Sequence, residues 1–132
     1  MPVLYNKVER GSFLNKDAPK KWYPVLKSMG MIKEKDVAKR LADETTLNPK
    51  EAEMAVAQLM KVVSNALLNG NTVQLGELGS FRLTASTESS DTKGEVTAAK
   101  IKKLNVRFTE SADLKNSLKN AKFVDASSLS NK

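Results

Sequence analysis

Four cations lie close together in the last third of the chain, within a run whose side chains alternate in character: Lys100, Lys102, Lys103 and Arg107. Lysine and arginine neutralise phosphates and release counterions, which gives binding to nucleic acid with little sequence preference. In a strand, alternation places Lys103 and Arg107 on one face and Lys102 on the other. The alternative is that these residues are exposed sheet positions whose charge keeps the protein soluble.

Further candidates lie on either side of this run. Arg82, on the preceding strand, is interpreted in the same way, and Lys93 and Lys115 are additional cations that either contact phosphate or are simply solvated. Gly79 and Ser80 could offer backbone N–H groups and a hydroxyl to a phosphate. A turn that requires glycine explains Gly79 at least as well.

The first 32 residues predict a β extension. Residues 3–10 alternate, residues 11–20 are rich in turn formers, and residues 22–31 form a second strand candidate that could pair with the first as a hairpin. Pro24 favours an edge position for that strand. The Trp22 and Tyr23 rings either close a small core, which we favour, or stack on nucleobases. Three lysines extend a basic surface or belong to a plain loop, namely Lys16, Lys20 and Lys21.

Two helices follow, over residues 33–46 and from Asn48 to Asn69. The second has the clearest signals, because Asn48 can cap it, Pro49 suits the first position and Glu51 completes a capping box. The remaining predictions are a strand over 72–75, a turn over 76–79, a strand over 80–83, a polar excursion over 84–99, a strand over 100–108, a helix capped by Thr109 or Ser111, and a tail over 121–132.

Composition excludes several kinds of chemistry. The chain has 132 residues, a net charge of +7, no cysteine and no histidine. A Ser-His-Asp triad, a Cys-His dyad and a histidine-ligated zinc site are therefore impossible within it. No group of carboxylates or lysines suggests catalysis. We expect a protein that is not an enzyme and that holds no metal and no cofactor.

Charge is unevenly distributed. Residues 1–32 carry six basic and two acidic side chains, residues 33–70 carry six of each, and residues 100–132 carry eight and three. Positive blocks around a neutral helical pair favour a polyanionic partner, nucleic acid before anionic membrane. No basic amphipathic helix supports a membrane partner. No leader segment or long apolar run is visible, so we expect a soluble intracellular protein.

Residues 33–120 resemble the bacterial histone-like proteins HU and integration host factor, and the chain is most similar to the longer Bacteroides-type members with an N-terminal extension. Leu78-Gly79-Ser80-Phe81 is similar to the family's aromatic-Gly-Thr/Ser-Phe turn, and residues 67–73 resemble the segment that leaves its second helix. Phe108 and Leu114-Lys115 resemble the end of its third strand and the start of its last helix.

The resemblance implies an α+β fold, in which a helical base carries a β-sheet extended into an arm. Residues 33–120 would be the HU-like domain, with residues 1–32 as an N-terminal β extension and residues 121–132 as a tail. It also implies an intertwined homodimer whose arms enter the minor groove of DNA. We therefore expect a histone-like protein that binds double-stranded DNA and organises the nucleoid in the cytoplasm, with no membrane partner and no small-molecule substrate.

The excursion over residues 84–99 departs from the family pattern. It contains no proline and no arginine, and its one cation, Lys93, stands among three carboxylates. In the family, an apolar wedge at the tip of each arm holds DNA kinked. Because this segment has no such proline wedge, we expect it to bend DNA weakly. It also favours the alternative function, in which the HU fold is a scaffold or a protein-interaction module with weak or no DNA binding.

Overall fold

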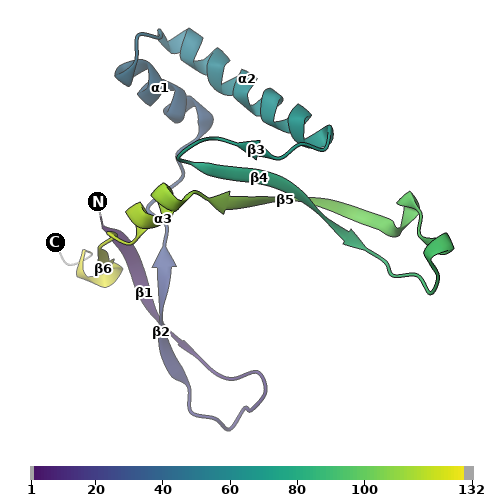
Figure 1. Cartoon of the computed structure of the whole chain (residues 1–132). Coiled ribbons are helices and arrows are strands. Elements are labelled where there is room, and N and C mark those ends of the chain that lie inside the picture. The colour runs from purple at the N-terminus through teal and green to yellow at the C-terminus, as the bar shows by residue number, and fades with distance from the viewer. Residues whose placement is uncertain (1, 130–132) are drawn as a thin grey trace. The chain divides into compact units, whose positions relative to one another are not determined.

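The computed structural model describes residues 2–129, and its contacts divide the chain into two compact units (Figure 1). One unit combines residues 1–32 with residues 118–132, and the other comprises residues 33–117. Each unit contains a three-stranded sheet, and the second unit also holds the long helices. The predicted α+β fold class is confirmed.

The first unit is built on a β-hairpin. Strands β1 (Val3–Arg10) and β2 (Lys21–Lys27) pair in antiparallel fashion, so the predicted hairpin is confirmed. The third strand, β6 (Phe123–Asp125), runs parallel to β1 on its other side. Strand β2 is thus an edge strand, which suits Pro24 because proline has no N–H to donate to a further neighbour.

Two boundaries in this unit differ from the expectations. Strand β2 ends at Lys27 rather than at Met31. Residues 121–132, expected as a tail, contain β6 and a 3-10 turn, η3 (Ala126–Ser128). The Val3 N–H donates to the Lys122 carbonyl at 2.7 Å, which begins the β1–β6 pairing. Strand β6 is too short to be stable without its distant partner β1. Local sequence patterns therefore did not reveal it.

The two faces of this sheet are buried to different extents. Leu4 is 8% exposed, and Val25 and Val124 on the same face are half-buried. Trp22, on the opposite face, is 67% exposed, and Tyr23 is 45% exposed. The expectation that the Trp22 and Tyr23 rings close a core was therefore wrong, because the smaller aliphatic residues fill that role.

The second unit begins with two helices, α1 (Glu34–Glu44) and α2 (Pro49–Leu68), which pack against each other. The Asn48 side chain accepts a hydrogen bond from the Glu51 N–H at 2.9 Å, which confirms the predicted N-cap. The best-buried residues described are Ala38 and Ala52, at 1% and 0% exposure. Such small side chains let helices approach closely, but they bury little apolar surface.

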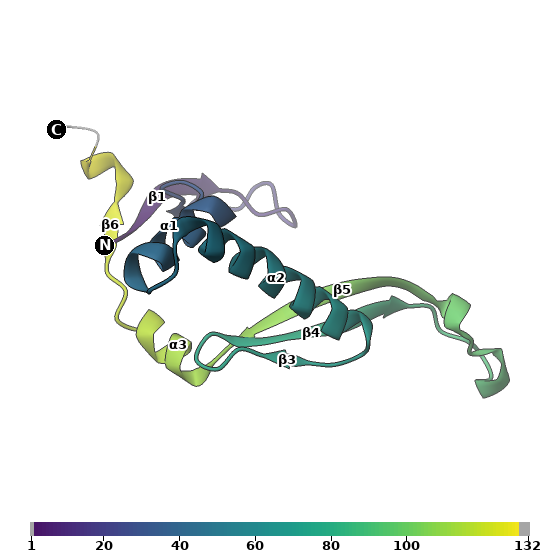
Figure 2. The same ribbon diagram turned by 90° about the horizontal axis from the view of Figure 1, so that it is seen from above.

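A sheet with the strand order β3-β4-β5 follows the helices. Its strands are β3 (Val73–Gln74), β4 (Gly79–Thr87) and β5 (Ile101–Glu110), and α3 (Ala112–Leu118) comes after them. Strand β4 extends four residues beyond the expected Leu83, because the polar residues after it continue to pair with β5. Figure 2 shows α2 running alongside β3 and β4, while β4 and β5 continue past it as a two-stranded ribbon.

Asp125 joins β6 to the rest of the first unit. Its carboxylate accepts hydrogen bonds from the Ser127 N–H at 3.0 Å and the Ser127 hydroxyl at 2.8 Å, and it lies 3.3 Å from the Lys7 ammonium. These contacts, the Ser127 backbone hydrogen bond foremost, hold the pKa of Asp125 below its ordinary value of 3.8. The ionised form therefore stabilises the folded unit.

We predict that attachment of β6 weakens in acid. Because the folded pKa of Asp125 is lowered, its contribution is present above the ordinary pKa and is lost as the pH falls through the folded value. The β1 amides that face β6 should lose protection, relative to their intrinsic exchange rate, as the pH falls below the ordinary pKa of 3.8. Asp125→Asn should show fast exchange at neutral pH and little further change in acid. The control Asp17→Asn should behave like the parent protein, and equal acceleration in both variants would contradict the prediction.

Candidate nucleic-acid interface

The pairing of β4 with β5 gives the ribbon one apolar and one polar face. Phe81 lies opposite Phe108, Leu83 opposite Val106 and Ala85 opposite Leu104. The intervening positions form the other face, which we call the cationic ribbon face. It consists of Ser80, Arg82, Thr84, Ser86, Lys103, Asn105, Arg107 and Thr109. Every side chain of this face can form hydrogen bonds, and none is a carboxylate.

Arg82 and Arg107 lie directly opposite each other on the cationic ribbon face, and Lys103 follows farther out, opposite Ser86. All three cations are exposed. Like charges at directly opposed strand positions repel and destabilise the pair. Over residues 2–129 the ion pairs are Lys7 with Asp125 and Lys102 with Glu88, so no carboxylate neutralises these three cations. A bound anion would relieve the repulsion, and the face is suited to receive one.

The apolar face holds the ribbon in this register. The rings of Phe81 and Phe108 have centroids 5.0 Å apart and are tilted by 45°, and this separation lies within the range of interacting aromatic pairs. A slip of one residue would exchange the two faces. The position of the cations therefore depends on the aromatic pair behind them.

The other predicted cations lie elsewhere. Lys102 is on the apolar side of β5 by alternation, and its ammonium lies 3.4 Å from the Glu88 carboxylate. Lys93 begins the 3-10 turn η1 (Lys93–Glu95) and Lys100 ends η2 (Ala98–Lys100), so Lys100 precedes β5 rather than starting it. Lys115 is exposed on α3. The structure thus brings together Arg82, Lys103 and Arg107, but not the remaining cations.

Gly79 begins β4 after a tight turn. The Leu75 N–H donates to the Gly79 carbonyl at 2.8 Å, and the Leu78 N–H donates to the Leu75 carbonyl at 2.9 Å. Gly79 is buried with φ of +149°, a conformation that side chains rarely adopt. A Cβ there would lie 2.3 Å from the Thr109 carbonyl oxygen. The glycine is thus explained by the turn and the packing, whereas Ser80 belongs to the cationic ribbon face.

The helix after the ribbon is tied back to this turn. The Ser111 N–H donates to the Leu78 carbonyl at 3.2 Å, and its hydroxyl donates to the Glu77 carbonyl. The same hydroxyl accepts from the Leu114 N–H at 3.0 Å, so Ser111, and not Thr109, caps α3. These hydrogen bonds therefore join the residue after β5 to the turn before β4 at the base of the ribbon.

Sequence reasoning missed the hydroxyl and amide groups that surround the cations: Thr84, Ser86, Asn105 and Thr109. Thr84 and Ser86 could have been found only from the pairing register, because Thr84–Thr87 looked like part of a polar loop, whereas alternation already placed Asn105 on the face of Lys103 and Arg107. Such groups commonly contact DNA phosphates. No cluster of three or more potential metal ligands occurs among the residues described, and no helix there is both long and apolar enough to span a bilayer.

The chain belongs to the HU-HIG family, described as an HU domain fused to wHTH, Ig, or Glycine-rich motif, which it matches over residues 1–124. That range includes the β1–β2 hairpin as well as the ribbon, and the predicted resemblance to HU-like proteins is confirmed. No curated protein matches the chain.

The fold is similar to the crystal structure of a "Putative bacterial DNA binding protein" from Bacteroides vulgatus ATCC 8482, with a TM-score of 0.65 and 16% identity. The match covers 94% of this chain and 48% of that one, so this chain spans about half the length of its structural neighbour. At this identity the likeness concerns the fold.

We predict that Gly79→Ala destabilises the protein by about 3 kcal/mol, because its Cβ would overlap backbone in a conformation that alanine resists. Gly94→Ala is the matched control, since nothing lies within 4 Å of a Cβ there and its φ is not positive. We expect the control to change the free energy of unfolding by less than about 0.5 kcal/mol. Urea denaturation compares the two, and equal losses would show that Gly79 is not constrained as described.

Proposed function

We propose that this chain is a non-enzymatic, histone-like protein that binds double-stranded DNA through phosphate contacts from the cationic ribbon face. The observation that carries the proposal is the opposed pair Arg82 and Arg107, with Lys103 beside it and no carboxylate on that face. The surrounding hydroxyl and amide groups add uncharged donors for phosphate oxygens. Membership of an HU-like family supports the same partner.

Binding of this kind would depend little on sequence. Cations on a two-stranded ribbon contact the sugar–phosphate backbone, which carries no direct sequence information. A protein with these properties would coat or compact bacterial DNA, so we place it at the nucleoid in the cytoplasm. The chain would need no cofactor for this.

We further propose a homodimer. The helices of the second unit leave large apolar side chains exposed: Val37 at 41%, Leu59 at 48%, Met60 at 51% and Val62 at 53%. Among the residues that the structure describes, no large side chain is fully buried. So many exposed large apolar side chains on one helical pair favour an interface, and a two-fold dimer is the commonest way to cover them. Two copies would also present two cationic ribbon faces to one duplex.

The first prediction concerns the salt dependence of duplex binding. If three cations of each protomer contact phosphates in a dimer, these six contacts should contribute about −5 to the slope of log affinity against log salt. The triple variant Arg82→Ala, Lys103→Ala, Arg107→Ala should lose most of that slope. Anisotropy titrations with two duplexes of unrelated sequence, which should bind within about tenfold of each other, measure it.

The matched control removes three cations from the helices, as Lys39→Ala, Lys50→Ala, Lys61→Ala. It changes the net charge equally, so it should leave most of the slope intact. Equal loss in both triple variants would mean that overall charge, not the cationic ribbon face, drives binding. Absence of duplex binding by the parent protein at low salt would instead favour the scaffold function, which the acidic excursion and the Lys102–Glu88 ion pair are compatible with.

The second prediction concerns assembly. Sedimentation at micromolar concentration should report twice the chain mass of 14.5 kDa. Leu59→Glu should shift the protein to monomer or unfold it, because a carboxylate would be buried in the interface. The neighbouring substitution Gln58→Glu adds the same charge at an exposed position of α2 and should remain dimeric. A parent protein that sediments as a folded monomer would overturn the dimer.

A further inference from the structure

Most of the chain's net charge belongs to the first unit, not to the unit with the ribbon. Residues 1–32 and 118–132 together carry nine basic and three acidic side chains, whereas residues 33–117 carry thirteen and twelve. The cationic ribbon face accounts for none of the excess in the first unit. The excess positive charge of the first unit therefore indicates a second anion-binding surface, on the unit that contains the β1–β2 hairpin.

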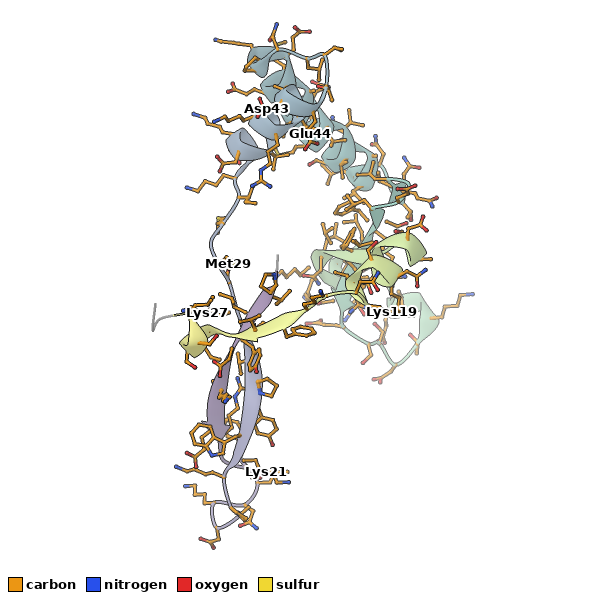
Figure 3. The ribbon with its side chains drawn as sticks, turned by 90° about the vertical axis from the view of Figure 1, so that its left-hand side faces the viewer. Lys21, Lys27, Met29, Asp43, Glu44 and Lys119 are labelled. Carbon is orange, nitrogen blue, oxygen red and sulfur yellow. The ribbon has the colours of Figure 1, made fainter. Side chains whose placement is uncertain are left out.

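The outer end of the β1–β2 hairpin carries a pair of opposed cations. Arg10 lies directly opposite Lys21, as Arg82 lies opposite Arg107 in the ribbon. Both are exposed, and neither takes part in the ion pairs found over residues 2–129. Opposed like charges cost stability in a strand pair unless an anion offsets them. Figure 3 shows Lys21 at the end of β2 beside the connecting loop and Lys27 at the other end.

A hollow of about 480 Å³ lies beside these cations, and it is lined by Arg10, Ser12, Lys21 and Tyr23 together with the loop residues Gly11, Ala18 and Pro19. Tyr23 shares a face with Arg10 and Lys21, because it lies opposite Val8 in the register. The hollow thus combines two cationic residues with a serine and a tyrosine. These are groups that bind a phosphate and its attached sugar or base.

The tip of the hairpin is apolar. Phe13 is 103% exposed and Leu14 is 99% exposed, so neither side chain packs on its own unit. The loop around them is ordered by its own hydrogen bonds, from the Leu14 N–H to the Ser12 hydroxyl at 3.2 Å and from the Ala18 N–H to the Asn15 carbonyl at 3.2 Å. Four cations flank the pair within residues 10–21, against one acidic residue, Asp17.

A cationic hairpin with an exposed apolar tip is suited to kinking a DNA duplex. Apolar side chains that enter between stacked base pairs hold the duplex kinked, while cations beside them neutralise the flanking phosphates. The excursion between β4 and β5 lacks this chemistry, since its three carboxylates outnumber Lys93 and its exposed apolar side chain is Val96. The apolar wedge and the excess cations that the excursion lacks are both present on the β1–β2 hairpin.

We propose that the tip of the β1–β2 hairpin is a second DNA-contacting arm. In it, Arg10 and Lys21 bind backbone phosphates, and Phe13 and Leu14 insert between base pairs from the minor groove. This site is separate from the cationic ribbon face and does not require it. An anionic membrane and a second protein are the rival occupants of an exposed apolar tip. The opposed cations Arg10 and Lys21, beside a hollow that also contains Ser12 and Tyr23, favour the duplex over both.

The direct experiment labels the tip. The chain has no cysteine, so Leu14→Cys provides a unique site for an environment-sensitive dye. Linear duplex should shift its emission to the blue and protect it from acrylamide. A dye that stays exposed with saturating duplex overturns the arm. A response to phosphatidylglycerol vesicles without a response to duplex overturns it in favour of a membrane, and a response to protein concentration alone overturns it in favour of self-association.

The functional experiment measures bending by energy transfer between the ends of a duplex. The parent protein should bend it by about 20 to 90°. Phe13→Ser, Leu14→Ser should abolish most of the bend and keep the salt slope, whereas Arg10→Ala, Lys21→Ala should reduce the slope by about two for each bound hairpin. The matched control Val96→Ser, at 64% exposure in the other excursion, should change neither. An unchanged bend in the serine variant, with its fold intact by circular dichroism, overturns the wedge.

The cationic ribbon triple variant separates this inference from the proposed function. With the dye at position 14 in that background, duplex at low salt should still protect the tip, although overall affinity falls. Full duplex affinity in the triple variant with a protected tip would overturn the role of the ribbon and support the hairpin arm. Loss of tip protection in that background would overturn the independence of the second site.

Discussion

The antiparallel register of β4 with β5 is the constraint on which the proposed interface depends. Strand side chains alternate with a period of two, so one register alone sets Arg82 against Arg107 and turns Phe81 and Phe108 the other way. Contact between the two aromatic rings stabilises the strand pair in this register, whereas repulsion between the two arginines destabilises it. Gly79 fits the base of this strand pair because a Cβ there would overlap both the Thr109 carbonyl oxygen and the Phe108 ring. Apolar contacts on one face thus maintain an unfavourable concentration of charge on the other.

The β1–β2 hairpin follows the same principle with a different tip. Its opposed cations, Arg10 and Lys21, lie at the outer end of a strand pair whose aliphatic residues are buried at the inner end. Beyond the cations the chain places Phe13 and Leu14 in solvent, whereas the ribbon ends in acidic and hydroxyl residues. The two hairpins therefore carry similar pairs of opposed cations and chemically different ends. In the proposed mode of binding, one hairpin would attach the protein to the duplex electrostatically and the other would deform the duplex.

Local sequence signals predicted the elements that depend on local interactions. Asn48, Pro49 and Glu51 located the start of α2, because a cap is formed by residues three positions apart. Local sequence signals did not predict the elements whose structure depends on pairing with a distant strand. Strand β6 exists because β1 lies beside it, and Thr84–Thr87 are extended because Lys103 and Asn105 pair with that region. Likewise, alternation alone placed Lys103 with Arg107, but only the register added Arg82 to the same face.

The small interior of the second unit connects assembly with DNA binding. Its best-buried helix residues are alanines, and Leu59 and Met60 on the same helix remain half-exposed, so a partner copy would supply burial that one chain lacks. In the proposed dimer, binding of one cationic ribbon face would hold the second near the same duplex at high effective concentration. DNA would thus bind the dimer more tightly than the monomer, and mass action would make DNA stabilise the dimer. The weak packing of the single chain would then couple folding of the protein to binding of the proposed polyanionic ligand.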